Sequence, residues 1–256
     1  MALLEVKNLK KVYTTRFGAN KVEALSDVSF SVEAGEYVAI MGESGSGKTT
    51  LLNILATLDQ PTGGDILLNG KSMREIDKKH KSAFRRDNLG FIFQDFNLLD
   101  TFSIKDNILL PLVLQGKTVE EMGQKANVLA KKLDIESVLN KYPYEVSGGQ
   151  KQRTAAARAL ITKPQLVLAD EPTGALDSKA SGKMLRILAD VNQEGQTILM
   201  ATHSIAAAKY AGRVLFIKDG TIFHQIYRGN ANDDEMYKRI SDALTLMMAQ
   251  GEHANE

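Results

Sequence analysis

The 256-residue sequence lacks several features that would indicate whole classes of protein. It contains no cysteine, which excludes disulfide bridges and thiolate-ligated metal sites. Neither sign of charge dominates, with 32 Lys and Arg against 31 Asp and Glu. Because a nucleic-acid-binding protein usually carries a basic excess on one face, this balance predicts that no nucleic acid is a partner.

A long apolar run is also missing. A membrane-spanning helix needs about 20 apolar residues, whereas the best apolar stretch, residues 108–114, is short and contains Pro111. The first six residues show no basic region followed by a long apolar stretch, so no secretory signal is expected. We therefore expect a soluble, cytoplasmic protein that reaches a membrane only through a partner.

Short apolar runs alternate with helically spaced segments along most of the chain, which predicts a mainly parallel sheet covered by helices on both sides. Near the N-terminus, residues 3–9 alternate in the manner of a strand, with Leu3, Glu5, Lys7 and Leu9 expected on one face. Further strands are predicted at 24–32, 37–41, 89–93, 165–169, 197–201 and 214–217, and helices at 49–58, 77–86, 183–191 and 235–249.

Residues 42–49 form a glycine-rich motif that matches the phosphate-loop pattern GxxxxGK[ST] between a predicted buried strand and a predicted helix. Glycines allow backbone N–H groups to converge on phosphate oxygens, and the helix N-terminus favours an anion. Lys48 is expected to neutralise the β- and γ-phosphates of ATP, and the Thr49 hydroxyl to ligate Mg²⁺. The predicted phosphate-binding residues are Gly42, Glu43, Ser44, Gly45, Ser46, Gly47, Lys48, Thr49 and Thr50.

A second motif, residues 166–171, ends an apolar strand with two carboxylates. Ligand sites of α/β folds lie at the carboxyl ends of such strands. Asp170 is therefore expected to hold Mg²⁺, and Glu171 to act as the general base that polarises the attacking water. Alone, the stretch is typical of any strand that ends in an acidic turn. Its interpretation as a metal and catalytic motif depends on the presence of the phosphate loop.

Residues 145–153 resemble the signature sequence of ATP-binding-cassette (ABC) ATPases, with Val146 where leucine is usual. The resemblance extends along nearly the whole chain, in the order of that family. It includes Tyr13 as the adenine-stacking aromatic, Gln94 as the Q-loop glutamine, 175–177 as the D-loop and His203 as the switch histidine.

The resemblance implies roles for residues whose type alone indicates little. Gln94 would contact Mg²⁺ or the attacking water, and with Thr49 and Asp170 it completes the expected metal ligands. His203 would contact the γ-phosphate and orient Glu171, which makes Lys48, Glu171 and His203 the expected catalytic residues. Considered singly, Gln94 is equally an ordinary surface amide, His203 a structural histidine and Tyr13 a strand aromatic.

A second anion site follows from Ser147, Gly148 and Gly149, which with Gln150 open a predicted helix. The phosphates of one nucleotide are already held by residues 42–49, so the second site is expected to cap the ATP of another subunit. This predicts a head-to-tail dimer with two ATP molecules at the interface. Geometrically, the same turn is also an ordinary helix N-cap.

The expected fold class is α/β, with a P-loop NTPase core around a mainly parallel sheet. An N-terminal antiparallel β subdomain and an α-helical subdomain inserted at about 96–163 complete the ABC ATPase domain, residues 1–228. Helical spacing and few strand signals indicate the insert. Residues 229–256 are expected to form a C-terminal helical tail.

Resemblances of shorter segments indicate a subgroup of the ABC ATPases. A short insertion at 17–20, together with 58–63, resembles the macrolide-export and lipoprotein-release group, and 93–102 resembles the ATPases of bacitracin-type transporters. This implies an ATPase that powers a separate membrane permease and so exports or detoxifies antimicrobial peptides such as bacitracin. Lipoprotein release, or force transmission without substrate transport, is the alternative, and the choice between a homodimer and a mixed dimer stays open.

A cluster of apolar residues beside Gln94 has two interpretations of equal weight. It can form an exposed groove that receives a helix of the permease, or it can fill the core beneath the helical insert. The cluster comprises Phe91, Phe93, Phe96, Leu98, Leu99 and Phe102.

Overall fold

The structure, a computed structural model, describes residues 2–14 and 21–252, with side chains up to residue 246. Its ten strands form one sheet in the order β5-β4-β1-β2-β10-β9-β3-β8-β7-β6. The strands are β1 Ala2–Thr14, β2 Lys21–Glu33, β3 Tyr37–Met41, β4 Gly63–Leu68, β5 Lys71–Ser72, β6 Leu89–Ile92, β7 Leu166–Asp170, β8 Thr197–Thr202, β9 Arg213–Lys218 and β10 Thr221–Tyr227.

The sheet has a parallel part and an antiparallel part. Strands β9, β3, β8, β7 and β6 pair in parallel, with β10 antiparallel at their edge. Strands β2, β1, β4 and β5 pair antiparallel. The two parts meet where β10 lies beside β2. This arrangement confirms the α/β fold class with its mainly parallel core and its N-terminal antiparallel strands.

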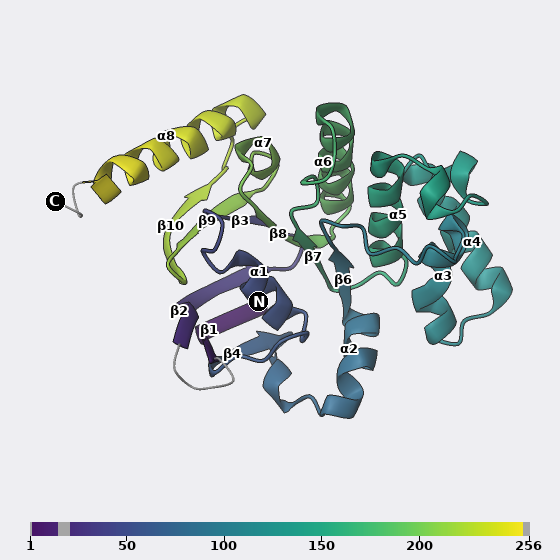
Figure 1. Cartoon of the computed structure of the whole chain (residues 1–256), viewed down its shortest axis with the longest axis horizontal. Helices are drawn as coiled ribbons and strands as arrows, with labels where there is room; N and C mark the ends of the chain where they lie inside the picture. Colours follow the sequence, from purple (N-terminus) through teal and green to yellow (C-terminus); the bar gives the residue numbers. More distant parts are fainter. Residues whose placement is uncertain (1, 15–20, 253–256) are drawn as a thin grey trace.

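The described residues include eight α-helices (Figure 1). They are α1 Lys48–Leu55, α2 Lys81–Asn88, α3 Ile104–Leu114, α4 Val119–Lys132, α5 Gly148–Leu160, α6 Ser178–Gln193, α7 Ile205–Ala208 and α8 Asp233–Glu252. Helices α3, α4 and α5 follow one another between β6 and β7 and lie together at one end of the molecule (Figure 1). Their place in the chain is that of the expected helical insert, whose exact limits stay a prediction.

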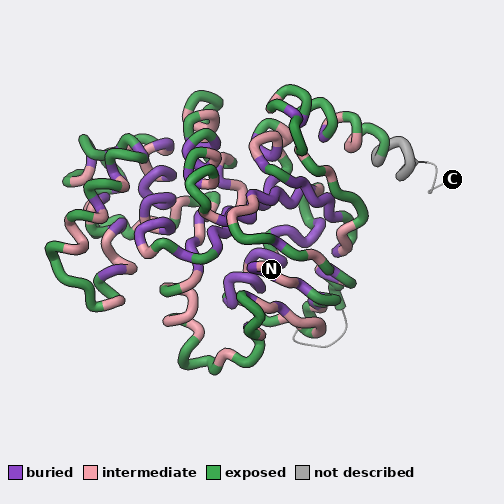
Figure 2. The backbone as a smooth tube through the Cα atoms, turned by 180° about the vertical axis from the view of Figure 1, so that it is seen from behind, coloured by how far each residue is buried: buried purple, intermediate pink, exposed green. Residues whose placement is uncertain are grey.

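The parallel strands are buried on both faces, because alternate residues enter two different hydrophobic clusters. In β3, Val38 and Ile40 pack with α1 and the antiparallel strands, whereas Ala39 and Met41 pack with the helices of the opposite face. Figure 2 shows the buried segments concentrated in the middle of the molecule. The central strands therefore provide a rigid edge on which the following loops can be placed.

Strand β1 departs from the strict alternation predicted for residues 3–9. Leu4 and Val6 are buried as one face, but Leu9 is buried on the same side, since the β1–β2 register shifts between Val6 and Leu9. Asn8 has a left-handed φ of 47° at this bulge. A bulge adds one residue to a strand and so reverses which side chains face the core, which the alternation could not reveal.

Several element limits also differ from the predictions. Helix α1 ends at Leu55 rather than residue 58, and Thr57 follows with a left-handed φ of 55°. The segment predicted as one helix at 77–86 is a short 3₁₀ turn, Lys78–His80, followed by α2. Strand β10 was not predicted, because its exposed residues lack a clear apolar period. The insertion at 17–20 lies outside the described residues.

The C-terminal helix α8 extends away from the sheet (Figure 1) and contacts the domain through Met236 and Ile240, which are fully buried. Leu244 packs beside them at the margin of the same core, and Met248 lies outside the described side chains. None of the helices in the described residues combines the length and apolarity needed to cross a bilayer.

Candidate functional site

The phosphate-loop residues connect β3 to α1 at the carboxyl end of the parallel strands. Gly47, immediately before α1, has a left-handed φ of 102°. A Cβ at this position would lie 2.5 Å from the carbonyl oxygen of Ala24, so no larger residue fits. At the start of the loop, a Cβ on Gly42 would lie 2.3 Å from the carbonyl oxygen of Ile217. Both glycines are thus required by close backbone approach.

Lys48 is buried at 8% exposure and curls back into the loop. Its ammonium donates to the carbonyl oxygens of Gly42 at 2.8 Å and Glu43 at 2.7 Å. Burial lowers the pKa of this ammonium, although the carboxylates of Glu171 and Asp170 oppose the effect. The buried Ser46 hydroxyl oxygen has no hydrogen-bond partner among the described residues. An ammonium with only neutral partners and an orphaned hydroxyl fit an incoming anion such as a phosphate.

Asp170 ends β7 beside the start of α1, where its Oδ1 accepts a hydrogen bond from the Thr49 hydroxyl at 3.3 Å. Burial raises the pKa of the Asp170 carboxyl, against the opposing hydrogen bond from Thr49. A half-buried carboxylate next to a hydroxyl provides hard oxygen ligands of the kind that Mg²⁺ prefers.

Glu171 follows in a left-handed conformation, with φ of 43°. The parallel register of β7 and β8 pairs Asp170 with Ala201 and so places Glu171 beside the end of β8. There its Oε1 accepts the backbone N–H of His203 at 2.9 Å and lies 2.7 Å from His203 Nδ1, and its Oε2 accepts the Thr202 hydroxyl at 3.0 Å. The carboxylate is therefore fixed in place by three donors, in a backbone conformation that costs energy for a non-glycine residue.

These groups surround a cleft of about 570 Å³. The cleft brings the phosphate loop together with the predicted Gln94, Glu171 and His203. Gln94 lies close to Gly174, where an added Cβ would come within 3.1 Å of the Gln94 amide carbon. The lining residues are Ala24, Glu43, Ser44, Gly45, Gly47, Lys48, Thr49, Thr50, Gln94, Glu171 and His203.

Other predicted residues lie outside this cleft lining. Tyr13 is 42% exposed at the end of β1. Ser147 caps α5: its hydroxyl accepts the N–H of Gln150 at 3.3 Å, and the Gln150 side chain accepts the N–H of Ser147 at 2.9 Å. Within one chain, the Ser147–Gly148–Gly149 turn is thus an N-cap, with no part in the walls of the cleft.

Sequence reasoning missed the buried Gln152 and the half-buried Arg158 of α5, and the Thr202 hydroxyl. The Gln152 amide donates to the carbonyl oxygens of Phe93 at 3.1 Å and Pro172 at 2.7 Å. The Arg158 guanidinium donates to those of Phe96 at 2.9 Å and Asn97 at 2.6 Å. Together these hydrogen bonds hold the backbone on both sides of Gln94. A polar residue on the buried face of an alanine-rich helix was the available signal.

Mg²⁺ fits the predicted ligands only together with a nucleotide. No group of three or more His, Asp or Glu side chains that could hold a metal ion exists among the described residues. Thr49 and Asp170 provide a hydroxyl and one carboxylate, and Gln94 lines the same cleft. Mg²⁺ is commonly bound by one or two carboxylates plus substrate phosphates, so the site suits a phosphate-bound metal ion.

Comparisons with known proteins find a family model, similar proteins and similar solved structures. Residues 25–174 match the family model of the ABC transporter. The chain is 50% identical over 255 residues to the ABC transporter ATP-binding protein YxdL of Bacillus subtilis (strain 168), covering 99% of this chain and 96% of that protein. It is 46% identical over 241 residues to the bacitracin export ATP-binding protein BceA of Halalkalibacterium halodurans, covering 94% of each.

Among solved structures, the dimeric post-hydrolysis state of the ATP-binding cassette MJ0796 bound to ADP and Pi matches with a TM-score of 0.81 at 37% identity. The match covers 88% of this chain and 98% of that one. The likeness therefore extends over most of the fold.

Proposed function

The chain belongs to the ABC transporter family as an ATP-binding, ATP-hydrolysing subunit, and from this premise we propose that it powers a separate membrane permease that exports peptide antibiotics such as bacitracin. The observation that carries the hydrolytic part is the cleft in which Lys48, Glu171 and His203 converge. The likeness to a bacitracin export ATP-binding protein over 94% of both chains supports the substrate class.

Hydrolysis uses the groups of the cleft in distinct roles. The loop N–H groups and Lys48 bind the triphosphate and absorb the charge that develops on its oxygens. Glu171, oriented by Thr202 and His203, accepts a proton from the attacking water. The His203 side chain, which is 70% exposed, contacts the γ-phosphate. Mg²⁺, when bound by Thr49, Asp170 and Gln94, neutralises phosphate charge.

The second half of the site comes from another copy. Because Ser147, Gly148 and Gly149 lie outside the cleft of their own chain, they are free to close over the γ-phosphate held by a partner subunit. The dimeric state of the similar cassette MJ0796 supports this arrangement. Hydrolysis then removes the phosphate that joins the two subunits, and the dimer opens.

The permease contacts the surface beside Gln94, on the cytoplasmic face of the membrane. The structure divides the apolar cluster predicted there: Leu99 is 44% and Phe102 38% exposed, whereas Phe91, Phe93, Phe96 and Leu98 are half-buried. Tyr144, 70% exposed, stacks on Tyr142 in a segment joined to this one by the bond from Ile104 N–H to the carbonyl oxygen of Lys141 at 2.8 Å. These exposed apolar residues form the docking surface, and Gln94 connects it to the ATP.

Bacitracin tolerance tests the substrate class. Cells that carry Glu171→Gln in place of the native chain should lose tolerance to the level of a deletion strain, since the permease is no longer driven. Cells that retain full tolerance would contradict peptide export. Mislocalised lipoproteins at unchanged tolerance would favour the lipoprotein-release alternative.

The docking surface is tested with Leu99→Glu. This exposed position tolerates a charge without unfolding, so the variant should keep its ATPase activity but no longer co-purify with the permease. Val119→Glu on α4, where the side chain is 83% exposed, is the matched control and should still co-purify. Normal permease binding by Leu99→Glu would place the docking surface elsewhere.

A further inference from the structure

Tyr13 is held by two residues that have no place in the phosphate cleft. Its hydroxyl donates to Asp59 Oδ2 at 2.8 Å, and the Lys11 ammonium lies 4.6 Å from the centre of its ring. Lys11 also donates to Asp59 Oδ1 at 2.6 Å and to the carbonyl oxygen of Gln60 at 2.8 Å. The three side chains thus form one closed network between β1 and the turn after α1.

This network is shielded from solvent more than an ordinary surface ion pair. The Lys11 side chain is 10% and the Asp59 side chain 29% exposed. Burial by itself raises the pKa of the Asp59 carboxyl, but the hydrogen bonds from Lys11 and Tyr13 outweigh it and hold that pKa below its ordinary value. Interactions in such partly buried surroundings are stronger and more rigid than those between exposed charges.

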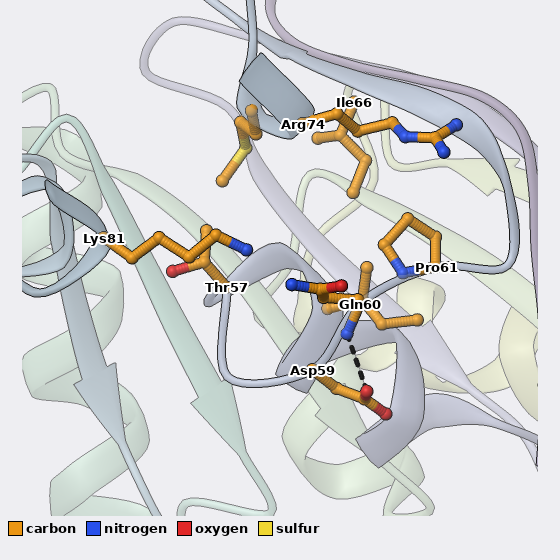
Figure 3. Close-up of a pocket in the computed structure, with 9 residues that line it drawn as sticks. Thr57, Asp59, Gln60, Pro61, Ile66, Arg74 and Lys81 are labelled. Carbon is orange, nitrogen blue, oxygen red and sulfur yellow. Dashed lines mark hydrogen bonds between the residues drawn. The ribbon is translucent and has the colours of Figure 1, made fainter. Parts of the chain in front are cut away.

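Asp59 also connects Tyr13 to the helix that begins at the phosphate loop. The N–H groups of Leu58 and Asp59 both donate to the carbonyl oxygen of Asn53 in α1, at 2.9 and 3.2 Å. Asp59 borders a separate pocket of about 190 Å³, where its carboxylate accepts the N–H of Gln60 at 2.6 Å and is turned away from Lys81 (Figure 3). Its charge is thus directed to Lys11 and Tyr13, not to the pocket.

We infer that Asp59 and Lys11 are positioning residues for the nucleotide base, which they orient through Tyr13. Lys11 covers one face of the ring, so a base can stack only on the opposite face. The hydroxyl bond to Asp59 fixes the ring before the base arrives, and a preorganised ring loses less conformational freedom on binding. The inference rests on the proposed ATP site and on the assignment of Tyr13 to the base.

The test compares a ligand with a base and one without. The full-length chain is titrated with a non-hydrolysable ATP analogue and with inorganic tripolyphosphate. Asp59→Ala and Tyr13→Phe should each weaken the analogue about fivefold, as expected for the loss of one hydrogen bond, and leave tripolyphosphate affinity unchanged. The double variant should bind no more weakly than Asp59→Ala, because Asp59→Ala has already removed the hydroxyl bond that Tyr13→Phe removes.

Tyr13→Phe keeps the ring and removes one oxygen atom, so it remains informative even where Asp59→Ala impairs folding. Tyr237→Phe is the matched control: this tyrosine is 43% exposed and makes no hydrogen bond to any described residue, and the variant should bind as wild type does. Equal weakening of tripolyphosphate, additive losses, or unchanged analogue affinity in both variants would overturn the inference. Failure of the wild type to bind either ligand would instead overturn the proposed function.

Discussion

The phosphate loop and the Ser147–Gly148–Gly149 turn are both glycine-rich starts of a helix, yet only the first lies within a site. Around the phosphate loop, strand ends bring a buried lysine, two carboxylates and His203 to one cleft. At Ser147, the capping box satisfies the helix N-terminus with its own side chains. A helix N-terminus thus becomes an anion site through what faces it, and for this turn we propose that another subunit does so.

The two regions also differ in their effect on the stability of the fold. The cleft is lined by a left-handed Glu171, and beside it lie a half-buried Asp170 carboxyl with a raised pKa and an orphaned Ser46 hydroxyl. Such local departures from stability are expected at functional sites. The Ser147 turn instead stabilises α5. Mutations should therefore separate the regions: changes in the cleft affect chemistry within each chain, and changes at the turn affect assembly.

The largest expected effect is on hydrolysis by Glu171→Gln. Removing the proposed general base should slow phosphate release by about 10²- to 10⁴-fold, while ATP still binds. Gel filtration at saturating ATP should then show a trapped dimer, because closure no longer leads to hydrolysis. If only monomers appear under these conditions, the two regions do not meet across an interface.

Gly148→Asp should weaken dimerisation through the Ser147–Gly148–Gly149 turn and leave the cleft unchanged. A Cβ at Gly148 would meet its nearest neighbour, Leu176, at 3.7 Å, so the residue fits, and an acidic group in the first turn favours the helix. Facing a partner's triphosphate, the new charge should weaken ATP-dependent dimerisation about 100-fold. Gly148→Asn is the neutral control of the same shape. Analytical ultracentrifugation with ATP measures both, and equal dimerisation of the two variants would contradict the assignment.

Lys48→Ala should weaken ATP affinity about 10- to 100-fold, because charge-assisted hydrogen bonds contribute roughly 1.5–3 kcal/mol. The loss should be the same at protein concentrations below and above dimerisation, since Lys48 acts within its own chain. Calorimetric titration gives the affinity. Unchanged binding and turnover would remove the phosphate loop from the proposed site.

Arg158→Lys examines the connection between the two regions. Arg158 on α5 binds the carbonyl oxygens of Phe96 and Asn97, whose φ angles of 61° and 49° are left-handed. Burial lowers the pKa of its guanidinium, and a lysine cannot bind both oxygens in the same geometry. We expect a loss of about 1–3 kcal/mol in the free energy of unfolding, measured by urea denaturation. A variant as stable as wild type would show that residues 96–97 keep their conformation without the two bonds from Arg158.

The smallest expected effect is a pH dependence from Asp170. Its raised folded pKa means that, without nucleotide, the contribution of this carboxyl to stability is greatest below the ordinary pKa of about 3.9 and decreases as the pH rises through the folded value. Asp170→Asn should therefore be more resistant to urea than wild type at neutral pH, with the advantage lost in acid. Ser147→Ala, which removes the cap at the other region, should have the opposite sign, a loss of about 1 kcal/mol.

The sequence by itself determined the local parts of this protein. Three features each depend on residues within a few positions of one another: the phosphate loop, the two carboxylates after an apolar strand and the Ser147 cap. Their glycines and apolar runs indicate the local backbone conformation. The strands of the parallel core followed from the same short-range patterns. These are the features whose physical cause is local backbone geometry and local burial.

Only the tertiary structure decided which distant residues meet. The pairing of Asp170 with Ala201 brings Glu171 to His203, and the bulge at Asn8 reverses the burial pattern of β1. Lys11 and Asp59, which are 48 residues apart in the chain, carry no pattern that predicts their contact. Strand register and helix packing are set by the summed burial of the whole core, so no single segment contains them.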